Sequence, residues 1–146
     1  MRWARRFSAQ RGAAIVETIF AVLFLLFVMF GIVELARAWF TQQLATAAVR
    51  EAVRAGAVAA QANVSTNGVA RIDAVLTAGG INPSNNPPVL VKSVALQPAC
   101  PSAGDHQVVA NVTVRFKTVF PLLLPILGTI DIPQSAVMRW EDQCAP

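Results

Sequence analysis

The chain has 146 residues, of which 55% are hydrophobic, and this length accommodates one domain and a membrane segment. Twelve Lys and Arg residues stand against eight Asp and Glu residues, but four of the twelve lie within residues 1–12 and the remainder is balanced. No basic patch or set of stacking aromatic side chains is found beyond the leader, so the composition argues against a nucleic-acid partner. No acid pair, Gly-rich phosphate loop or Ser–His–Asp set stands out, so we expect neither an enzyme nor a cofactor.

Residues 1–12 form a basic leader that contains Arg2, Arg5, Arg6 and Arg11. Positive charge is retained on the cytoplasmic side of a membrane, so the leader predicts a cytoplasmic N-terminus and export of the chain beyond the apolar run. From the residues alone, two interpretations stay open. The leader is either a disordered tail that is retained, or a segment removed by a protease after Gly12, where the missing side chain lets the enzyme approach the backbone.

Residues 13–35 are predicted to form a transmembrane helix. From 13 to 33 the side chains are apolar except for Glu17 and Thr18, and this run matches the ~20 residues that a helix needs to cross a bilayer. A carboxylate within such a span costs ~2.5–3.5 kcal/mol on insertion scales. We therefore treat Glu17 as a candidate functional residue.

Residues 36–62 are expected to continue the helix outside the membrane, because they contain no Pro and are rich in good helix formers. Glu34 and Arg37 are three positions apart and can pair at the outer membrane edge, where Trp39 suits the interface. One face of the helix is predicted to carry the small and apolar residues Leu35, Trp39, Ala45, Val49, Ala52, Val53, Gly56 and Ala60. The alternative is a membrane helix joined to a separate soluble helix.

Residues 11–57 resemble a known family. A basic leader, Gly12, a Glu five positions later and an apolar run resemble the processing site of type IV pilin-like proteins. The longer pattern, RGAA-x-VE, an apolar run, G-I-x-E-x-x-R and an Ala-rich continuation, resembles the TadE-like pseudopilins of the tight-adherence (Tad, or Flp-type) pilus. The matching positions are Arg11, Gly12, Ala13, Ala14, Val16, Glu17, Gly31, Ile32, Glu34 and Arg37.

This resemblance implies a single-pass protein of the bacterial inner membrane with a cytoplasmic N-terminus and a periplasmic, pilin-like C-terminal domain. A prepilin peptidase would cleave after Gly12 and leave Ala13 as the first residue. Its further partners would be other pilin-like subunits and the pilus assembly platform. The subunit would either enter the filament or prime its assembly. Glu17 would then neutralise the new α-amino group of a neighbouring subunit.

Two other interpretations compete with processing after Gly12. A conventional secretory signal could be cut near Ala38, since Ala36-Arg37-Ala38 has the A-x-A form. Against this, the apolar run is too long, and two charged residues lie at the proposed cut. The chain could also be an uncleaved, single-span periplasmic binding module, although a plain anchor gains nothing from Glu17.

Residues 63–146 are predicted to form a small α+β domain with an antiparallel sheet. Asn, Ser, Thr and Gly at 63–68 indicate a break, after which Val69, Ile72, Val75 and Leu76 repeat at helical spacing. The pair Gly79-Gly80 is expected to end this short helix. After a loop at 81–88, alternating residues predict strands at 89–96, 107–119 and 135–140.

Cys100 and Cys144 both lie C-terminal to the span and would be in the oxidising periplasm, so we expect a disulfide between them. The alternatives are two free thiols or a metal pair, but with one His in the chain the ligand set for zinc is poor. His106 itself is interpreted as a solvated turn residue.

The segment 120–127 reads FPLLLPIL, and its two prolines exclude a regular strand or helix. It is interpreted either as core filler folded onto the sheet or as an exposed patch that contacts a neighbour or the bilayer surface.

Overall fold

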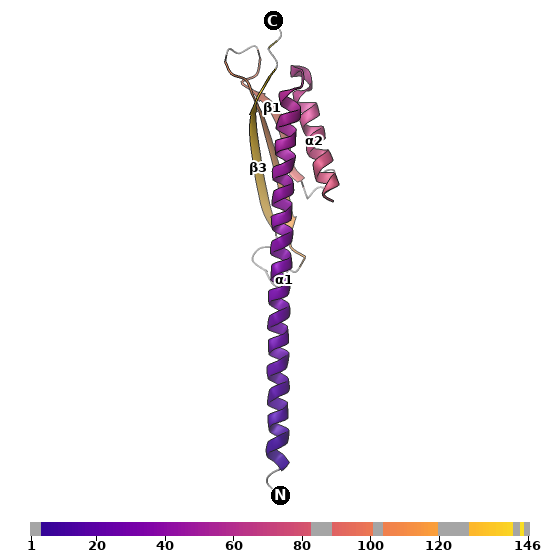
Figure 1. The fold of residues 1–146 in the computed structure, drawn as a ribbon, viewed down its shortest axis with the longest axis vertical. Coiled ribbons are helices and arrows are strands. Elements are labelled where there is room, and N and C mark those ends of the chain that lie inside the picture. The colour runs from indigo at the N-terminus through magenta and orange to yellow at the C-terminus, as the bar shows by residue number, and fades with distance from the viewer. Residues whose placement is uncertain (1–3, 83–88, 101–103, 120–128, 142–143, 145–146) are drawn as a thin grey trace.

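The computed structural model describes residues 4–82, 89–100, 104–119, 129–141 and 144, with side chains from Ala14 onward (Figure 1). It has the predicted α+β layout of one long apolar helix, one short helix and a three-stranded antiparallel sheet. The elements are α1 (Ala4–Ala57), a 3-10 turn (Gln61–Asn63), α2 (Val64–Ala78), β1 (Val89–Gln97), β2 (Gln107–Lys117) and β3 (Thr129–Arg139).

The helix α1 has 54 residues and is about 80 Å long at 1.5 Å per residue. Its N-terminal half projects alone, whereas its C-terminal half packs against the rest of the chain (Figure 1). It begins at Ala4, so the described part of the leader belongs to the same helix. It ends at Ala57 and not at the predicted residue 62, because the chain turns there and the N–H of Ala59 donates to Gly56 O.

The apolar face predicted on α1 is only partly the face that packs. Ala45, Val49, Ala52, Val53 and Gly56 are buried as expected, together with Ala48. Leu35 and Trp39 are instead 71% and 62% exposed, and Ala60 is exposed as well. At the end of the apolar run, the side of α1 that meets the sheet carries the buried Glu34, and the neighbouring Leu35 points away from the domain.

The predicted break at 63–68 is wrong, because α2 already begins at Val64. Buried residues at four-residue spacing form its inner stripe, namely Val64, Gly68, Ile72 and Leu76. A Cβ on Gly68 would lie 2.6 Å from Val94 Cγ1, so this glycine allows α2 to approach β1 closely. The helix ends before Gly79-Gly80 as predicted, with Gly80 at a φ of 81°.

The sheet has the order β1-β2-β3 with antiparallel pairing, and β2 lies in the centre. Alternate residues of β2 face the helices and are buried, namely Val108, Ala110, Val112, Val114 and Phe116. The third strand begins at Thr129, six residues before the predicted start, and it contains Pro133. Proline cannot donate to a neighbouring strand, but β3 is an edge strand and one of its sides needs no partner.

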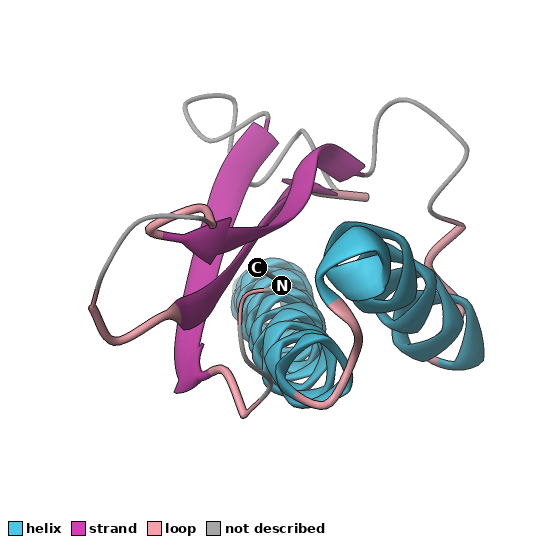
Figure 2. Cartoon of the chain, turned by 90° about the horizontal axis from the view of Figure 1, so that it is seen from above, coloured by secondary structure: helices cyan, strands magenta, loops and turns pink. Residues whose placement is uncertain are grey.

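The core lies between the sheet and the two helices, which cover one face of the sheet (Figure 2). Helix α1 packs on α2, β2 and β3, while α2 packs on α1 and β1. Ala45, Ala48 and Ala52 are fully buried on α1, and their small side chains let its backbone come close to its neighbours. The larger core side chains include Val49, Ile72, Leu76, Val108, Val112 and Val114.

An exposed ion pair joins β2 to β3: Arg115 Nε lies 2.7 Å from Asp131 Oδ1, and Nη2 lies 3.1 Å from Oδ2. Hydrogen bonds from Arg115 lower the pKa of Asp131 below its usual 3.8, with the charge attraction adding to them. We expect an NMR titration to find this lowered pKa and Arg115→Gln to raise it towards the usual value. The pair stabilises the fold above the unfolded-state pKa of Asp131, and this contribution is lost as the pH falls through the lowered folded-state pKa. An unchanged pKa in Arg115→Gln would contradict the assignment.

Candidate functional site

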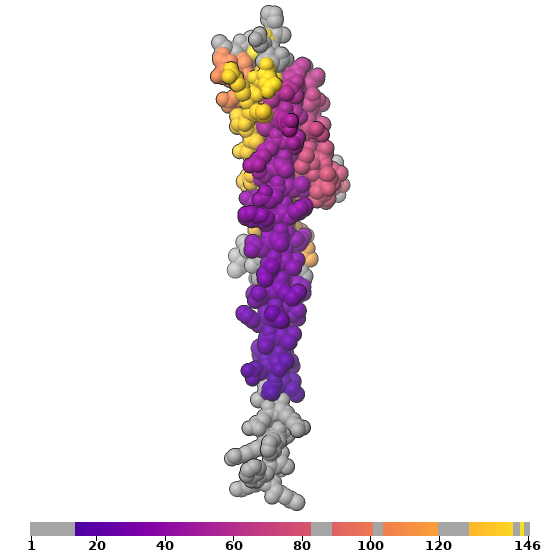
Figure 3. Space-filling view, viewed as in Figure 1, coloured from indigo at the N-terminus to yellow at the C-terminus, as the bar shows by residue number. Residues whose placement is uncertain are grey.

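Among the described residues, α1 is the one helix that is long and apolar enough to cross a membrane, over Ala14–Ala57. Only 6% of its most apolar window is buried inside the molecule, which distinguishes it from the core helix of a soluble protein. Phe20 and Phe24 are each 70% exposed, and Figure 3 shows this part of α1 standing free of the domain. This exposed apolar surface is compatible with membrane anchoring.

The predicted processing motif lies within this helix. Gly12 and Ala13 belong to α1, so the peptide bond between them is part of a helical backbone. Glu17 is exposed and makes no hydrogen bond or ion pair with the described side chains, whereas the neighbouring Thr18 donates to Ala14 O at 2.9 Å. Among the described side chains the carboxylate therefore has no ionic partner, and the surface around it is mainly apolar.

Glu34 and Arg37 form the ion pair that their spacing predicted, with Arg37 Nη1 at 3.0 Å from Glu34 Oε1. The structure adds a partner that the sequence did not indicate: the backbone N–H of Val119 donates to the same oxygen at 3.0 Å. The Arg37 guanidinium also lies 5.4 Å from the ring centroid of Phe116. We call this set, Glu34, Arg37, Phe116 and Val119, the joint, because it ties the end of β2 to α1.

Within the joint, the Glu34 carboxylate and the Phe116 ring are buried, whereas Arg37 and Val119 are exposed. The Glu34 side chain is 7% exposed and that of Arg37 is 44% exposed. Two buried oxygens, Glu34 Oε2 and Thr118 Oγ1, have no hydrogen-bond partner among the described residues. No local pattern could have revealed the contact between α1 and β2, because Glu34 and Val119 are 85 positions apart. The segment 120–127 comes next in the chain but lies outside the described residues.

Cys100 and Cys144 are bonded at the opposite end of the domain, with their Cα atoms 5.6 Å apart. His106, interpreted from the sequence as a solvated turn residue, lies in the loop before β2 and makes specific contacts. It is half-buried, its Nδ1–H donates to Pro98 O at 2.7 Å, and its Nε2 lies 3.2 Å from Cys144 Sγ. Its ring also meets the ring of Trp140 edge-on, with 5.9 Å between centroids.

Trp140 was not singled out in the sequence, yet it connects three parts of the domain. It is 4% exposed, and its Nε1–H donates to Ala59 O at 3.0 Å, next to the end of α1. Its backbone N–H donates to His106 O at 2.9 Å. The available signal was a large aromatic residue at the predicted end of a strand, four residues before a cysteine.

The described residues contain one group with metal-ligand geometry, formed by Cys100, His106 and Cys144, whose ligand atoms lie within 4.8 Å of one another. Metal ligation requires thiolates, and both sulfur atoms are here bonded to each other. This state therefore offers no thiolate ligand.

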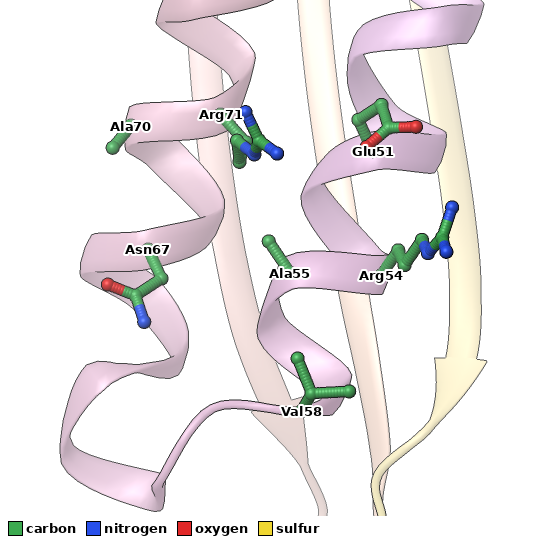
Figure 4. A pocket seen from close by; sticks show the side chains of 7 residues that line it. All are labelled: Glu51, Arg54, Ala55, Val58, Asn67, Ala70 and Arg71. Atoms are coloured by element: carbon green, nitrogen blue, oxygen red, sulfur yellow. The ribbon is translucent and has the colours of Figure 1, made fainter.

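A groove of ≈ 740 Å³ lies between α1 and α2 (Figure 4). Its lining consists of Glu51, Arg54, Ala55, Val58, Asn67, Ala70 and Arg71. Figure 4 shows Arg54 pointing away from α2, so the two arginines do not converge on one point. This lining includes neither a nucleophile nor a histidine, and we assign it no chemistry.

The fold and these sites define a class of protein in which one long apolar helix carries a small α+β domain with a disulfide. Residues 12–54 match the model of a family described as TadE-like protein. This match confirms the predicted resemblance, and it spans Gly12 to Glu17 of the predicted processing motif, the apolar run and the α1 part of the joint. The TadE-like family points to association with the tight-adherence pilus and to a structural role. No curated protein and no solved structure matches the chain.

Proposed function

We propose that this protein is an inner-membrane pseudopilin, a minor pilin-like subunit that takes part in assembling a tight-adherence pilus. A prepilin peptidase removes residues 1–12, residues 13–35 cross the membrane, and the chain from residue 36 lies in the periplasm. The arginines of the leader hold the N-terminus in the cytoplasm. Residues 63–146 then form the disulfide-linked periplasmic domain, and the joint lies at the outer membrane edge.

The observation that carries this proposal is the lone carboxylate of Glu17, five positions after Gly12 in the segment that matches the family. Cleavage would create an α-amino group on Ala13, one helical turn from Glu17. A free helix N-terminus also carries the positive end of the helix dipole. The amino group of a neighbouring subunit can pair with Glu17 without distorting the first turn. In lipid such a pair is favoured mainly because an unpaired charge is so costly.

Gly12→Leu is expected to abolish processing. The leucine side chain blocks approach of the peptidase to the backbone. Leucine also stabilises the helix that has to open before cleavage, because Leu is close to Ala in helix propensity and Gly is ~1 kcal/mol less favourable than Ala. Intact mass of the membrane-extracted protein should show loss of twelve residues in the wild type and the full-length chain in the variant.

Gly31→Leu is the matched control, because a Cβ at Gly31 meets nothing within 4 Å and this position is far from the cut. It should be processed normally. A mature wild-type chain that starts at Trp39 would support the conventional signal, and an uncleaved one would support the binding module.

Glu17→Gln is expected to leave insertion, cleavage and the periplasmic fold intact but to weaken association with pilin-like partners. Co-purification of the cleaved variant with those partners, together with pilus production in a complementation assay, measures this. Glu51→Gln removes a carboxylate from the same helix in the domain and should behave as wild type. Normal partner association and normal pilus production by Glu17→Gln would show that this carboxylate has no role in assembly.

A further inference from the structure

The end of β2 reaches α1 where the apolar run stops. Val33 is the last residue of that run, and Glu34, the next one, accepts the hydrogen bond from the Val119 N–H at 3.0 Å. Arg37, one turn further on, lies over the ring of Phe116. No spacer therefore separates the sheet from the membrane segment, and Figure 1 shows the lower end of the strands beside α1.

The dimensions of a bilayer place this contact within the lipid headgroups. A hydrocarbon core of ~30 Å within a total thickness of ~40–45 Å leaves ~5–8 Å for each headgroup layer. At 1.5 Å per residue, Glu34 lies ~1.5 Å and Phe40 ~10 Å beyond Val33. Helical side chains lean towards the helix N-terminus, which brings Trp39 and Phe40 back towards the membrane.

The side chains at this level suit such a layer. Trp39, Phe40 and Val119 are 62%, 58% and 59% exposed. Lys117 is exposed and has no ion-pair partner among the described residues. Aromatic side chains such as that of Trp are enriched at the membrane–water interface. A lysine can make a charge-assisted hydrogen bond to a lipid phosphate. A bilayer surrounds the helix, so these side chains need not share one face of it.

We propose that the membrane-proximal end of the domain, formed by Trp39, Phe40, Lys117 and Val119, lies in the outer headgroup layer of the bilayer that α1 crosses. Its partner is phospholipid, which contacts the β2 end directly. The joint holds that end at a fixed depth, since the Val119 N–H is bonded to the helix itself. This inference rests on the membrane anchoring in the proposed function and adds a lipid-binding surface on the sheet.

The test uses Val119→Cys in the full chain, with the free thiol labelled by bimane while the native disulfide stays closed. Only the side chain changes, so the backbone N–H of residue 119 still donates to Glu34. The protein is placed in vesicles of phosphatidylcholine and phosphatidylglycerol. Quenching of the label is then measured with a headgroup nitroxide lipid and with aqueous iodide.

Two labelled positions serve as controls. Val137→Cys lies towards the opposite end of the sheet, where the native residue is 55% exposed, and it should be quenched by iodide and not by the lipid. Leu23→Cys lies in the apolar run, and it should be quenched by lipid that carries the nitroxide on its acyl chain. We expect the label at 119 to be quenched several-fold less by iodide than the label at 137 and to respond to the headgroup nitroxide.

The outcomes separate this inference from the proposed function. If iodide quenches the label at 119 as strongly as the label at 137 while the label at 23 responds to lipid, the proposed membrane anchoring is supported and the proposed headgroup contact is wrong. If the label at 23 does not respond to lipid, both are wrong. If iodide protection at 119 disappears at one chain per vesicle, the surface is covered by a second copy and not by lipid, which also overturns the inference.

Discussion

Serine at both Cys100 and Cys144 is expected to lower the free energy of unfolding of the α+β domain by about 4 kcal/mol. The bond links positions 44 residues apart, and opening it restores conformational freedom to that loop in the unfolded chain. A small domain has total stability of roughly 5–15 kcal/mol, so the variant would lose a large part of it. The loss would fall on the α+β domain, because the disulfide lies at the end of that domain opposite to the apolar segment of α1.

Urea unfolding of the full chain in detergent measures this effect through the fluorescence of Trp140. Trp3→Phe and Trp39→Phe are introduced into both proteins so that only Trp140 reports. Wild-type protein treated with a reductant is the control, and it should unfold at the same lower urea concentration as the double serine variant. Equal midpoints for oxidised and reduced protein would show that the bond contributes little.

Trp140→Ala is expected to destabilise the domain by about 3–5 kcal/mol, the usual cost of removing a buried indole. The substitution leaves a cavity, and it removes the hydrogen bond that Nε1 donates to Ala59 O. It also removes the ring that packs edge-on against His106. Hydrogen exchange of the Val108 and Val112 amides on β2 measures the loss of stability without needing tryptophan fluorescence.

One further variant tests whether the cavity or the lost hydrogen bond dominates the destabilisation, and a second variant is the control. Trp140→Phe keeps most of the apolar volume but leaves Ala59 O without its donor, so a smaller loss of about 1–3 kcal/mol is expected. Trp39→Ala changes a residue that is 62% exposed on α1, and β2 exchange should not respond. If Trp140→Ala lowered the free energy of unfolding no more than Trp140→Phe, packing of the aromatic ring would contribute nothing to stability.

Local patterns in the sequence were enough for the elements with strong periodicity. The long apolar run, which only Glu17 and Thr18 interrupt, predicted a long helix, because a helix satisfies its own backbone hydrogen bonds in an apolar surrounding. Alternation predicted a strand at 107–119, and β2 occupies Gln107–Lys117 of that range, with the residues on one side meeting the helices. Gly79-Gly80 predicted the end of α2 through the left-handed conformation that glycine accepts. The motif from Arg11 to Arg37 was also local, which is why the family resemblance could be read directly.

The tertiary structure decided the features that depend on contacts between residues far apart in the sequence. Asn63, Ser65, Thr66 and Gly68 have weak helix propensity, but packing of Gly68 on Val94 outweighs it and α2 begins early. Pro133 lies in β3 because that strand is at the edge, and the order of strands in a sheet cannot be read from a single strand.

The sites divide in the same way. By itself the sequence determined the membrane-type helix, the spacing of Gly12 and Glu17, the Glu34–Arg37 pair and the two cysteines, because each depends on neighbouring positions or on composition. Only the tertiary structure decided that Val119 bonds to Glu34 and that Trp140 bonds to Ala59, across 85 and 81 positions of the chain. Both contacts use backbone groups as partners. Every residue has a backbone carbonyl, and every residue except proline has a backbone N–H, so no residue type in the sequence could mark these contacts.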